Sequence, residues 1–408
     1  MLIVSIETSC DETAVSLVEA HGDFPNATYE IRGNALYSQI AIHKEYGGVF
    51  PALAKREHIK NILPLFAQAL REGEALEESP SEVDAQTAEN VHTILTREEG
   101  LSEELLSFFA AHELPPIDLI AVTTGPGLEP ALWVGVNFAK ALAALTKAPL
   151  VSVNHMEGHI LASLFDAVED DKLADIAFPA VALLISGGHT ELVLVRDWID
   201  YEKIGQTKDD AVGEAFDKVA RMLGIPYPGG PEVSARAARA REAKLPPFKA
   251  DLPRPMLHSN DLDFSFSGLK TSVRYAIEGK SLTPEETDAL CRDFEDAVTE
   301  VLLKKSADAL TQHGGRTLIV GGGVSANTYI KKTLTESLLA SHPDVEIYFP
   351  APKLSTDNSV MIALAGHAHY ESASRAGAIQ YVRADGNRSL QEASAEPFFM
   401  LLSPLYAR

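Results

Sequence analysis

The feature that most constrains this chain is a pattern of strand, polar turn and strand that occurs twice. Residues 4–18 (VSIETSCDETAVSLV) and 182–195 (ALLISGGHTELVLV) both run from an apolar stretch through small and polar residues into a second apolar stretch. Aligned on Thr13 and Thr190, the two copies lie 177 residues apart. Short apolar runs bounded by turn residues predict β-strands, and their recurrence predicts a duplicated architecture.

After each copy, the sequence predicts a third strand and then helices that alternate with strands. In the first half the expected elements are strands at 30–39, 117–124 and 149–153 and a helix at 131–146. In the second half they are strands at 201–206, 316–321 and 345–349, with helical patterns at 214–223, 267–312, 325–340 and 358–370. Such alternation predicts an α/β protein of two lobes, each a mixed sheet flanked by helices, with a cleft between the lobes.

These elements divide the chain into lobes and insertions. We expect a first lobe at 1–176 with an acidic insertion at about 71–115, and a second lobe at 177–372 with a loop-rich insertion at about 225–266. Residues 373–408 form a C-terminal extension to which the sequence assigns no role. A length of 408 residues suits two domains of ordinary size.

The composition and the first residues of the chain indicate where in the cell the protein is located. No apolar run approaches the about 20 residues that a membrane-spanning helix needs, so we expect no membrane association. The first residues, MLIVSIE, lack a basic leader and enter a strand directly, which favours a cytoplasmic protein without a signal peptide. The two cysteines, Cys10 and Cys291, cannot build a disulfide framework and offer no paired metal-ligand spacing.

The net charge of −23 argues against a protein that binds nucleic acid through its overall electrostatic field. Much of the acid is local, because residues 71–106 hold eleven Asp or Glu and two Arg, a pattern typical of a solvated helical or partly disordered insertion. Basic side chains gather locally too, and any contact with nucleic acid would be confined to them or shared with a partner. The first group is Lys44, Lys55, Arg56 and Lys60, and the second is Arg236, Arg239, Arg241 and Lys244 within residues 234–249. The alternative for both groups is a solvated surface.

Glycine-rich turns supply candidate phosphate sites. Ser186, Gly187, Gly188 and Thr190 can present backbone N–H groups and hydroxyls to an anion, because glycine lets the backbone approach closely. Residues 321–323 are three glycines between an expected strand and helix, where the helix dipole would help. Each turn alone is better explained as a plain tight turn, but their recurrence in a duplicated fold favours nucleotide binding.

A candidate metal site lies in NHMEGHILASLF. His155 and His159 are four residues apart on an expected helix, so their side chains project from one face, directly after a strand. The alternative is a surface or core histidine pair. A zinc-peptidase motif would need Glu directly after the first histidine, but residue 156 is Met.

Asp357 could supply a third ligand, although the simpler interpretation is the N-cap of a helix that starts near Asn358. Two imidazoles and a carboxylate suit a divalent cation such as Zn²⁺, Fe²⁺ or Mn²⁺, with positions left open for a ligand phosphate.

Taken in order, these motifs resemble the TsaD family of tRNA adenosine threonylcarbamoyltransferases, once labelled O-sialoglycoprotein endopeptidases. The resemblance runs from residue 2 to about 372, and the longer acidic insertion and Trp133 depart from the family pattern. The blocks that carry it are SIETSCDET, HKEYGGVFPALAKREHIKNILPL, GPGLEPALWVG, NHMEGHILASL, LISGGHTEL, GEAFDKVARMLGIPYPGGP, FSFSGLKTSV, GGGVSAN and STDNSVMIA.

The resemblance implies an actin-like ATPase fold of the ASKHA type, a duplicated ribonuclease H-like architecture, and assigns residues by position. His155, His159 and Asp357 match the metal ligands. Ser9, Cys10 and Glu12 should face the reactive end of the donor, with Cys10 a contact residue and not a nucleophile, because acidic neighbours raise a thiol pKa. The nucleotide part of the donor should meet Leu184, Ile185, Ser186, Gly187, Gly188, Asp217, Gly230 and Asn327.

The implied reaction moves a threonylcarbamoyl group from threonylcarbamoyl-AMP to the exocyclic amine of the adenosine 3′ to the anticodon, in tRNAs that read codons beginning with A. Glu12 is a candidate for the base, and a structural acid that orders the turn is an equal alternative. Lys55, Arg56 and Lys60 are the favoured tRNA contacts. The implied partners are a TsaB-like paralogue that pairs through the first lobe, a TsaE-like ATPase and a separate synthase that supplies the donor.

Two other classes of function stay open from the sequence. An ATPase or kinase of the same fold would bind ATP through the same turns but would not need the histidine pair. A non-catalytic scaffold paralogue should lack both the metal triad and the GGGVSAN run, which this chain has. A metallopeptidase is the weakest alternative.

Overall fold

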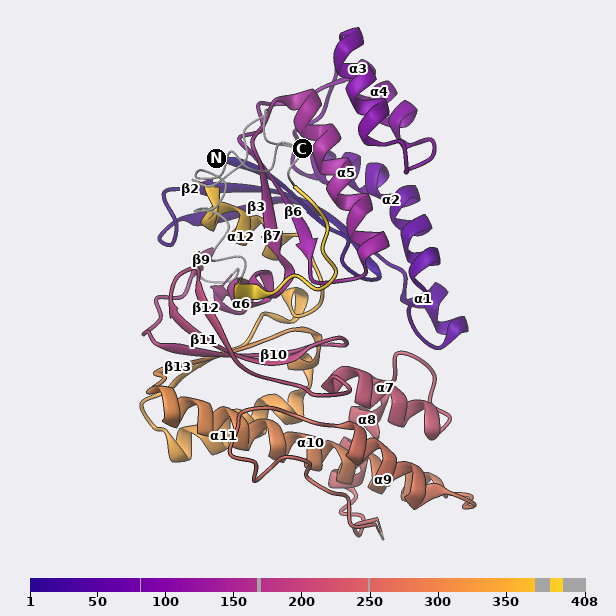
Figure 1. Ribbon diagram of the computed structural model, residues 1–408, viewed down its shortest axis with the longest axis vertical. Helices are drawn as coiled ribbons and strands as arrows, with labels where there is room; N and C mark the ends of the chain where they lie inside the picture. The colour runs from indigo at the N-terminus through magenta and orange to yellow at the C-terminus, as the bar shows by residue number, and fades with distance from the viewer. Residues whose placement is uncertain (81, 167–169, 249, 371–381, 392–408) are drawn as a thin grey trace, which may run out of the picture. The chain divides into compact units, whose positions relative to one another are not determined.

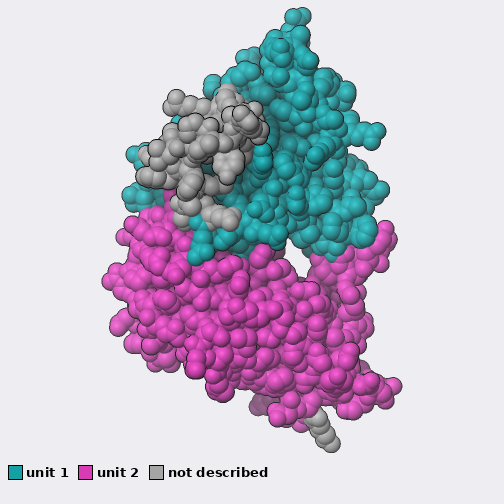
Figure 2. Space-filling view, viewed as in Figure 1, with its two compact units in different colours: residues 1–41, 49–174, 357–408 teal, residues 42–48, 175–356 magenta. Residues whose placement is uncertain are grey.

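The structure is a computed structural model that describes residues 1–408 except 81, 167–169, 249, 371–381 and 392–408. The described chain divides into two compact units, coloured separately in Figure 2. Unit 1 holds residues 1–41, 49–174 and 357–408, and unit 2 holds residues 42–48 and 175–356. The sequence placed 177–372 in one lobe, whereas the chain from Asp357 onward belongs to unit 1. Parts of the expected insertion (residue 81) and extension (373–381 and 392–408) lie outside the described residues.

The sheet of unit 1 begins with an antiparallel meander and continues in parallel. Its order is β7-β6-β1-β2-β3, extended by β9 and β8, and β1 pairs antiparallel with β2 but parallel with β6. Most residues of the central strands are buried and apolar, as the short apolar runs predicted. The strands are β1 (Leu2–Glu7), β2 (Glu12–His21), β3 (Thr28–Ser38), β6 (Leu119–Gly125), β7 (Leu150–Asn154), β8 (Phe165–Asp166) and β9 (Lys172–Leu173).

The sheet of unit 2 repeats this topology. Its order is β12-β11-β10-β13-β14, again an antiparallel meander followed by two parallel strands on the other side of the first strand. The two hairpins that suggested a duplication therefore occupy equivalent places in two sheets of one design, which confirms the expected α/β class. The strands are β10 (Ala180–Ile185), β11 (Thr190–Asp197), β12 (Asp200–Gln206), β13 (Thr317–Gly321) and β14 (Glu346–Tyr348).

In unit 1, helices cover both faces of the sheet (Figure 1). Alternate residues of β2 divide between the faces: Val15 joins the core beneath α2 and α5, while Ser16 bonds Ser359 next to α12. A Cβ atom at Gly366 of α12 would lie 2.4 Å from Ala121 Cβ, so that glycine permits close helix-to-sheet packing. The helices are α1 (Ile40–His43), α2 (Pro51–Glu72), α3 (Ala85–Ile94), α4 (Leu101–Ala111), α5 (Glu129–Thr146), α6 (His155–Leu164) and α12 (Val360–Ala368).

The acidic insertion is folded and helical over its described residues. It contains α3, α4 and the short strand pair β4 (Glu77–Glu78) and β5 (His112–Glu113). Its apolar residues Val91 and Leu105 join the core of unit 1 together with Phe66 of α2 and Phe138 of α5. Most acidic side chains of the insertion are exposed, both on its helices and in the turns between them, whereas Glu98 is buried.

In unit 2, the helices pack into a second core around α10, whose start carries a capping box between Thr283 and Glu286. The expected loop-rich insertion at 225–266 is partly helical, because residues 229–242 form α8. The helices are α7 (Val212–Met222), α8 (Gly229–Glu242), α9 (Ser267–Ile277), α10 (Pro284–His313) and α11 (Thr328–Ser341), with 3₁₀ turns at Lys44–Tyr46, Gly323–Ala326 and Pro352–Leu354. Across the described part of the chain, no helix is both long and apolar enough to cross a membrane.

The packing of the insertion yields a test of stability. Leu105→Ala should lower the free energy of unfolding by about 2–5 kcal/mol, because it opens a cavity in a fully buried site. Glu104→Ala, at the exposed neighbouring position, is the control and should change it by no more than about 0.5 kcal/mol. Urea unfolding of both variants measures the difference. Equal stability of the two would show that the insertion does not contribute to the core.

Candidate metal and donor site

Helix α6 places two histidines on one face at the end of a buried strand. Asn154, the last residue of β7, caps the helix by accepting a hydrogen bond of 2.9 Å from Met156 N. This cap makes His155 the first residue of α6, so that His159 lies one turn later with ring centroids 4.7 Å apart. Both histidines are buried, with 5% and 1% of their surface exposed.

Asp357 completes the cluster that the sequence suggested. Its Oδ1 atom lies 3.2 Å from His159 Nε2 and 3.5 Å from His155 Nε2. One ligand atom from each of the three residues lies within 4.8 Å of the others. The expectation that Asp357 caps the following helix is wrong, because α12 starts at Val360 with Ser359 at the N-cap, and Asn358 Oδ1 accepts from Met361 N at 3.0 Å.

The donor atoms of this cluster fit a divalent cation. His159 Nε2 is buried and has no hydrogen-bond partner among the described residues, although the carboxylate of Asp357 lies nearby. Burial lowers the pKa of His155, but the charges of Asp357 and Glu7 and a hydrogen bond to Glu7 outweigh it and raise the pKa to about 9. A cation would satisfy the same carboxylate in place of that proton.

Glu7, which the sequence left without a role, orients His155. This carboxylate ends β1, is fully buried and accepts from Ser9 N at 2.5 Å and Thr123 Oγ1 at 2.6 Å. Its Oε2 atom also lies 3.0 Å from His155 Nδ1, so His155 directs Nε2 toward Asp357. A carboxylate behind a ligating imidazole fixes the ring and its tautomer. In the sequence, the only sign of this role was that an acidic residue, Glu7, ends an apolar strand.

The turn after β1 brings two of the expected catalytic residues to the same cluster. Ser9 is buried, with Oγ 3.3 Å from His155 Nδ1. Burial raises the pKa of the Cys10 thiol well above its usual value, and the charges of Asp11, Asp357 and Glu12 add to this effect. Cys10 is therefore a thiol and not a thiolate at neutral pH, as expected for a contact residue, although it is half-buried.

Glu12 lies among the same acids. Burial, followed by the charges of Asp11 and Asp357, raises its pKa to about 10, and Ser38 Oγ donates to its Oε1 at 2.9 Å. A carboxyl group in this state carries its proton at neutral pH and cannot accept another. A nearby cation would lower its pKa, because positive charge favours the ionised form.

In the glycine-rich turn of unit 2, at residues 184–190, some residues are buried and others are open. Leu184 and Ile185 are fully buried strand residues, so only their backbone could serve a ligand. At Gly187 and Gly188, a Cβ atom would meet nothing within 4 Å among the described residues beyond its chain neighbours, which leaves that side of the turn open. Thr190 does not line the turn as expected, because it is buried and its hydroxyl accepts from Val212 N at 2.8 Å.

The other residues assigned to the nucleotide also hold helix starts in unit 2. Asp217 Oδ1 accepts from Gly229 N at 2.7 Å at the beginning of α8, where Gly230 follows. Asn327 caps α11 by accepting from Tyr329 N and Ile330 N, each at 3.0 Å. The glycines at 321–323 lead into a 3₁₀ turn and not directly into the helix expected from 325, since α11 starts at Thr328.

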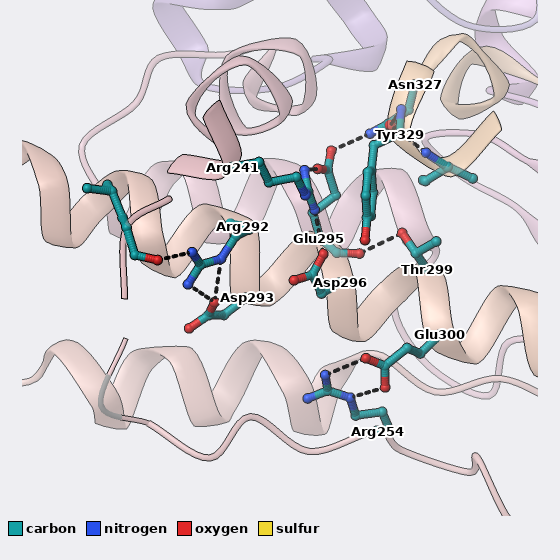
Figure 3. A network of polar contacts seen from close by, with 12 residues as sticks. Arg241, Arg254, Arg292, Asp293, Glu295, Asp296, Thr299, Glu300, Asn327 and Tyr329 are labelled. Carbon is teal, nitrogen blue, oxygen red and sulfur yellow. Dashed lines mark hydrogen bonds and ion pairs between the residues drawn. The ribbon is translucent and has the colours of Figure 1, made fainter. Parts of the chain in front are cut away.

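The arginines of the second basic group pair with acids of unit 2, and Figure 3 shows the contacts of Arg241. Arg241 donates to Glu295 and Asp296 at 2.5 Å each, and its guanidinium lies 3.3 Å from the centre of the Tyr329 ring. Glu295, which is fully buried, also accepts from Asn327 Nδ2 at 2.7 Å. Arg236 and Arg239 both pair with Asp288, at 3.2 and 3.0 Å. These arginines tie α8 to α10 through ion pairs, and their contact with nucleic acid stays an untested prediction. Lys249 lies outside the described residues.

The first basic group is divided. Lys55, Arg56 and Lys60 lie on α2 of unit 1, whereas Lys44 belongs to unit 2. Arg56 and Lys60 lie 3.8 and 4.0 Å from Glu57. Lys55 instead donates to the carbonyl of Arg97 at 3.4 Å. It also lines a cavity of about 300 Å³ whose wall comprises Lys55, Arg97, Glu129, Pro130 and Trp133.

Comparison with known proteins identifies the family. The family profile described as TsaD, tRNA N6-adenosine threonylcarbamoyltransferase, matches residues 30–85 and 101–364. A protein of that name from Ralstonia pickettii (strain 12J) is 42% identical over 371 residues, covering 90% of each chain. Another from Neisseria gonorrhoeae (strain ATCC 700825 / FA 1090) is 40% identical over 395 residues, covering 93% of this chain and 96% of its own.

Among solved structures, full-length HypF in a phosphate- and nucleotide-bound form aligns with a TM-score of 0.45 at 13% identity. The alignment covers 67% of this chain but only 42% of the HypF chain. The relation to the threonylcarbamoyltransferases is the one that spans nearly the whole sequence. The chain belongs to the tRNA N6-adenosine threonylcarbamoyltransferase family.

Proposed function

We propose that the chain transfers a threonylcarbamoyl group from threonylcarbamoyl-AMP to the exocyclic amine of the adenosine 3′ to the anticodon, in tRNAs reading codons that begin with A. The family relation supports the reaction class. The observation that carries the proposal is the buried cluster of His155, His159 and Asp357 beside the turn that holds Ser9. An ATPase or kinase of similar topology would have no need of this cluster.

His155, His159 and Asp357 would hold one divalent cation, with Fe²⁺ placed first and Zn²⁺ or Mn²⁺ as alternatives. When bound, the cation would neutralise charge on the donor phosphate as AMP leaves. Glu7 keeps the His155 ring fixed, because Ser9 N and Thr123 Oγ1 hold the carboxylate that contacts His155 Nδ1. Both histidines are buried, which strengthens charge interactions among the three residues.

The adenylate of the donor would bind to unit 2. The open turn at Ser186, Gly187 and Gly188 would supply backbone amides. Gly230 and Asn327 lie at the starts of α8 and α11, and Asp217 of α7 reaches the start of α8 through its side chain, so these residues could fix the ribose and base. The attacking amine is a weak nucleophile, since its lone pair is delocalised into the purine. Positioning must therefore supply much of the rate acceleration.

Glu12 remains the proposed base for the proton that the amine loses. It is suited only if a cation lowers its pKa, because burial and neighbouring acids keep it protonated otherwise. Ser9 and Cys10 would contact the threonylcarbamoyl end of the donor from the same turn. A TsaB-like paralogue pairing through the first lobe, a TsaE-like ATPase and a donor synthase complete the proposed set of partners.

For tRNA, Lys55, Arg56 and Lys60 stay the proposed contacts, and the surroundings of Lys55 extend the surface. Arg97 lies beside Lys55, and its guanidinium is 5.9 Å from the Trp133 ring centre. Lys140 Nζ lies 5.6 Å from the same ring. Cations gathered at an aromatic side chain are suited to a phosphate backbone with an unstacked base.

Mass spectrometry of nucleosides tests the reaction directly. Unmodified tRNA incubated with the chain and threonylcarbamoyl-AMP, with and without the proposed partners, should yield threonylcarbamoyladenosine at the position next to the anticodon. ATP turnover measured in the same mixtures separates an ATPase. Hydrolysis of ATP without any modified nucleoside in every mixture would refute the proposal.

His159→Ala or Asp357→Ala should abolish metal retention and transfer, because each removes a ligand. Both variants should keep the circular dichroism spectrum of the parent, since Asp357 is 20% exposed at its side chain and the histidine helix is held by Asn154. His313→Ala, at the end of α10, is the matched control and should retain the metal. Elemental analysis of the purified variants decides the outcome, and full occupancy in either ligand variant would contradict the assignment.

Reversing charge at the cavity should weaken tRNA binding. The double variant Lys55→Glu and Arg97→Glu should lower affinity by about tenfold or more and reduce the salt dependence by about two phosphate contacts. Lys304→Glu with Lys332→Glu makes the same change in net charge at exposed positions outside the cavity. Filter binding at two salt concentrations compares them. Equal losses in both double variants would point to net charge alone.

A further inference from the structure

The C-terminal segment packs onto a turn near the proposed metal ligands. Residues 382–391 are described, lie beyond the residues that match the family profile, and received no role from the sequence. Asp385 N donates to Thr124 O at 2.8 Å, and Gly127 N donates to Gly386 O at 3.1 Å. The segment therefore forms backbone hydrogen bonds on both sides of Gly125 and Pro126, directly after β6.

This contact is so close that it depends on glycine. A Cβ atom at Gly125 would lie 1.9 Å from the carbonyl oxygen of Asp385, and Gly125 has a φ of 147°. A Cβ atom at Gly386 would lie 2.8 Å from the carbonyl oxygen of Gly127. Both distances are shorter than a side chain tolerates, so a side chain at either position must push the segment away from the turn.

Arg388 anchors the segment to the sheet. It is 7% exposed, and its Nη1 atom donates to Thr124 Oγ1 of β6 and to Ser152 Oγ of β7. These two hydroxyl groups are themselves 2.9 Å apart. The guanidinium thus bridges the two parallel strands just before β6 enters the Gly125 turn and two residues before Asn154 caps α6.

The other side of the same turn meets the proposed site. Leu128 N donates to Ser9 O at 2.7 Å, and a Cβ atom at Gly127 would lie 2.6 Å from that oxygen. Thr123, next to Thr124, donates to Glu7, which in turn bonds His155. Two strands held by Arg388 therefore lead into the residues that fix Ser9 and His155.

We propose that residues 384–388 form a clamp on the Gly125–Gly127 turn, with Arg388 as a positioning residue that sets Ser9 and His155 in place. The inference rests on the proposed metal site. The clamp contacts neither the cation nor the donor; it acts through the turn and the ends of β6 and β7. Without it, the turn and the opening loop should open more often, and the histidine helix should lose the restraint on its first residue.

The test compares four full-length variants with the parent chain. Arg388→Ala removes the anchor, Arg388→Lys keeps its charge, and Gly386→Ala displaces the segment while leaving Arg388 in place. Arg383→Ala is the matched control, because Arg383 is an exposed arginine of the same segment. Cobalt(II) affinity and its visible absorption spectrum report on the ligand set, and hydrogen exchange without added metal reports on residues 5–12 and 121–128.

Arg388→Ala and Gly386→Ala should each weaken cobalt binding by about tenfold or more and speed amide exchange in both stretches. Arg388→Lys should recover part of both effects, and Arg383→Ala should match the parent. A lower melting temperature together with parental cobalt affinity and parental exchange in those stretches would reduce the segment to a structural role and overturn the proposal.

Failure of the metal site itself is distinguishable from failure of the clamp. If the parent binds no cobalt, or if His159→Ala binds it as the parent does, the metal assignment fails. In that case hydrogen exchange alone tests the clamp. Amide exchange in Arg388→Ala that matches the parent would overturn the proposal. If Arg388→Ala does not fold, the same measurements on Gly386→Ala decide.

Discussion

The buried carboxylate of Glu7 is the interaction on which the proposed site depends. It closes the opening turn through Ser9 N, holds β6 through Thr123 and fixes His155 of α6, so three separate segments share one anion. Hydrogen bonds to a charged group contribute about 1.5–3 kcal/mol each, and a buried carboxylate that lost them would be strongly unfavourable. These hydrogen bonds hold the turn after β1 in place, although the turn consists largely of small polar residues.

Around this anchor the chain gathers several acidic side chains close to one another. Burial raises the pKa of Cys10 and of Glu12, and the charges of Asp11 and Asp357 raise both further. Such crowding is unfavourable in a folded protein unless a ligand offsets it, and a divalent cation is the simplest ligand that would. The same crowding explains why Cys10 is protected from acting as a nucleophile.

The sequence predicted those parts of this arrangement that depend on residues close to one another along the chain. The duplicated hairpins, the alternation of strands and helices and the spacing of His155 and His159 are local patterns, and the structure has each of them. Contacts between distant segments left no such pattern. Arg388 reaches Thr124 across 264 residues, and Arg241 reaches Glu295 across 54, so neither pairing could be read from neighbouring residues. The prediction of the residue that caps α12 was wrong for another reason. Aspartate and asparagine are both common cap residues, so Asp357 and Asn358 look equally suited in the sequence, and only the backbone conformation shows which of them accepts the hydrogen bond.

The residues assigned to the nucleotide illustrate why a site residue and a structural residue need not be alternatives. Asp217 and Asn327 use backbone-directed oxygen atoms to start α8 and α11, and Asn327 also binds Glu295 in the network that holds α8 to α10. Helix starts present unpaired N–H groups, which suit an anion, so the residue that orders such a start also shapes the place where a phosphate binds. Loss of nucleotide binding on mutation of Asn327 would therefore not by itself distinguish contact with the nucleotide from collapse of the Arg241 network. Because Arg241 bonds Glu295 through the other carboxylate oxygen, Asn327→Asp would keep the cap but set two carboxylates against each other, so even this conservative change disturbs the network.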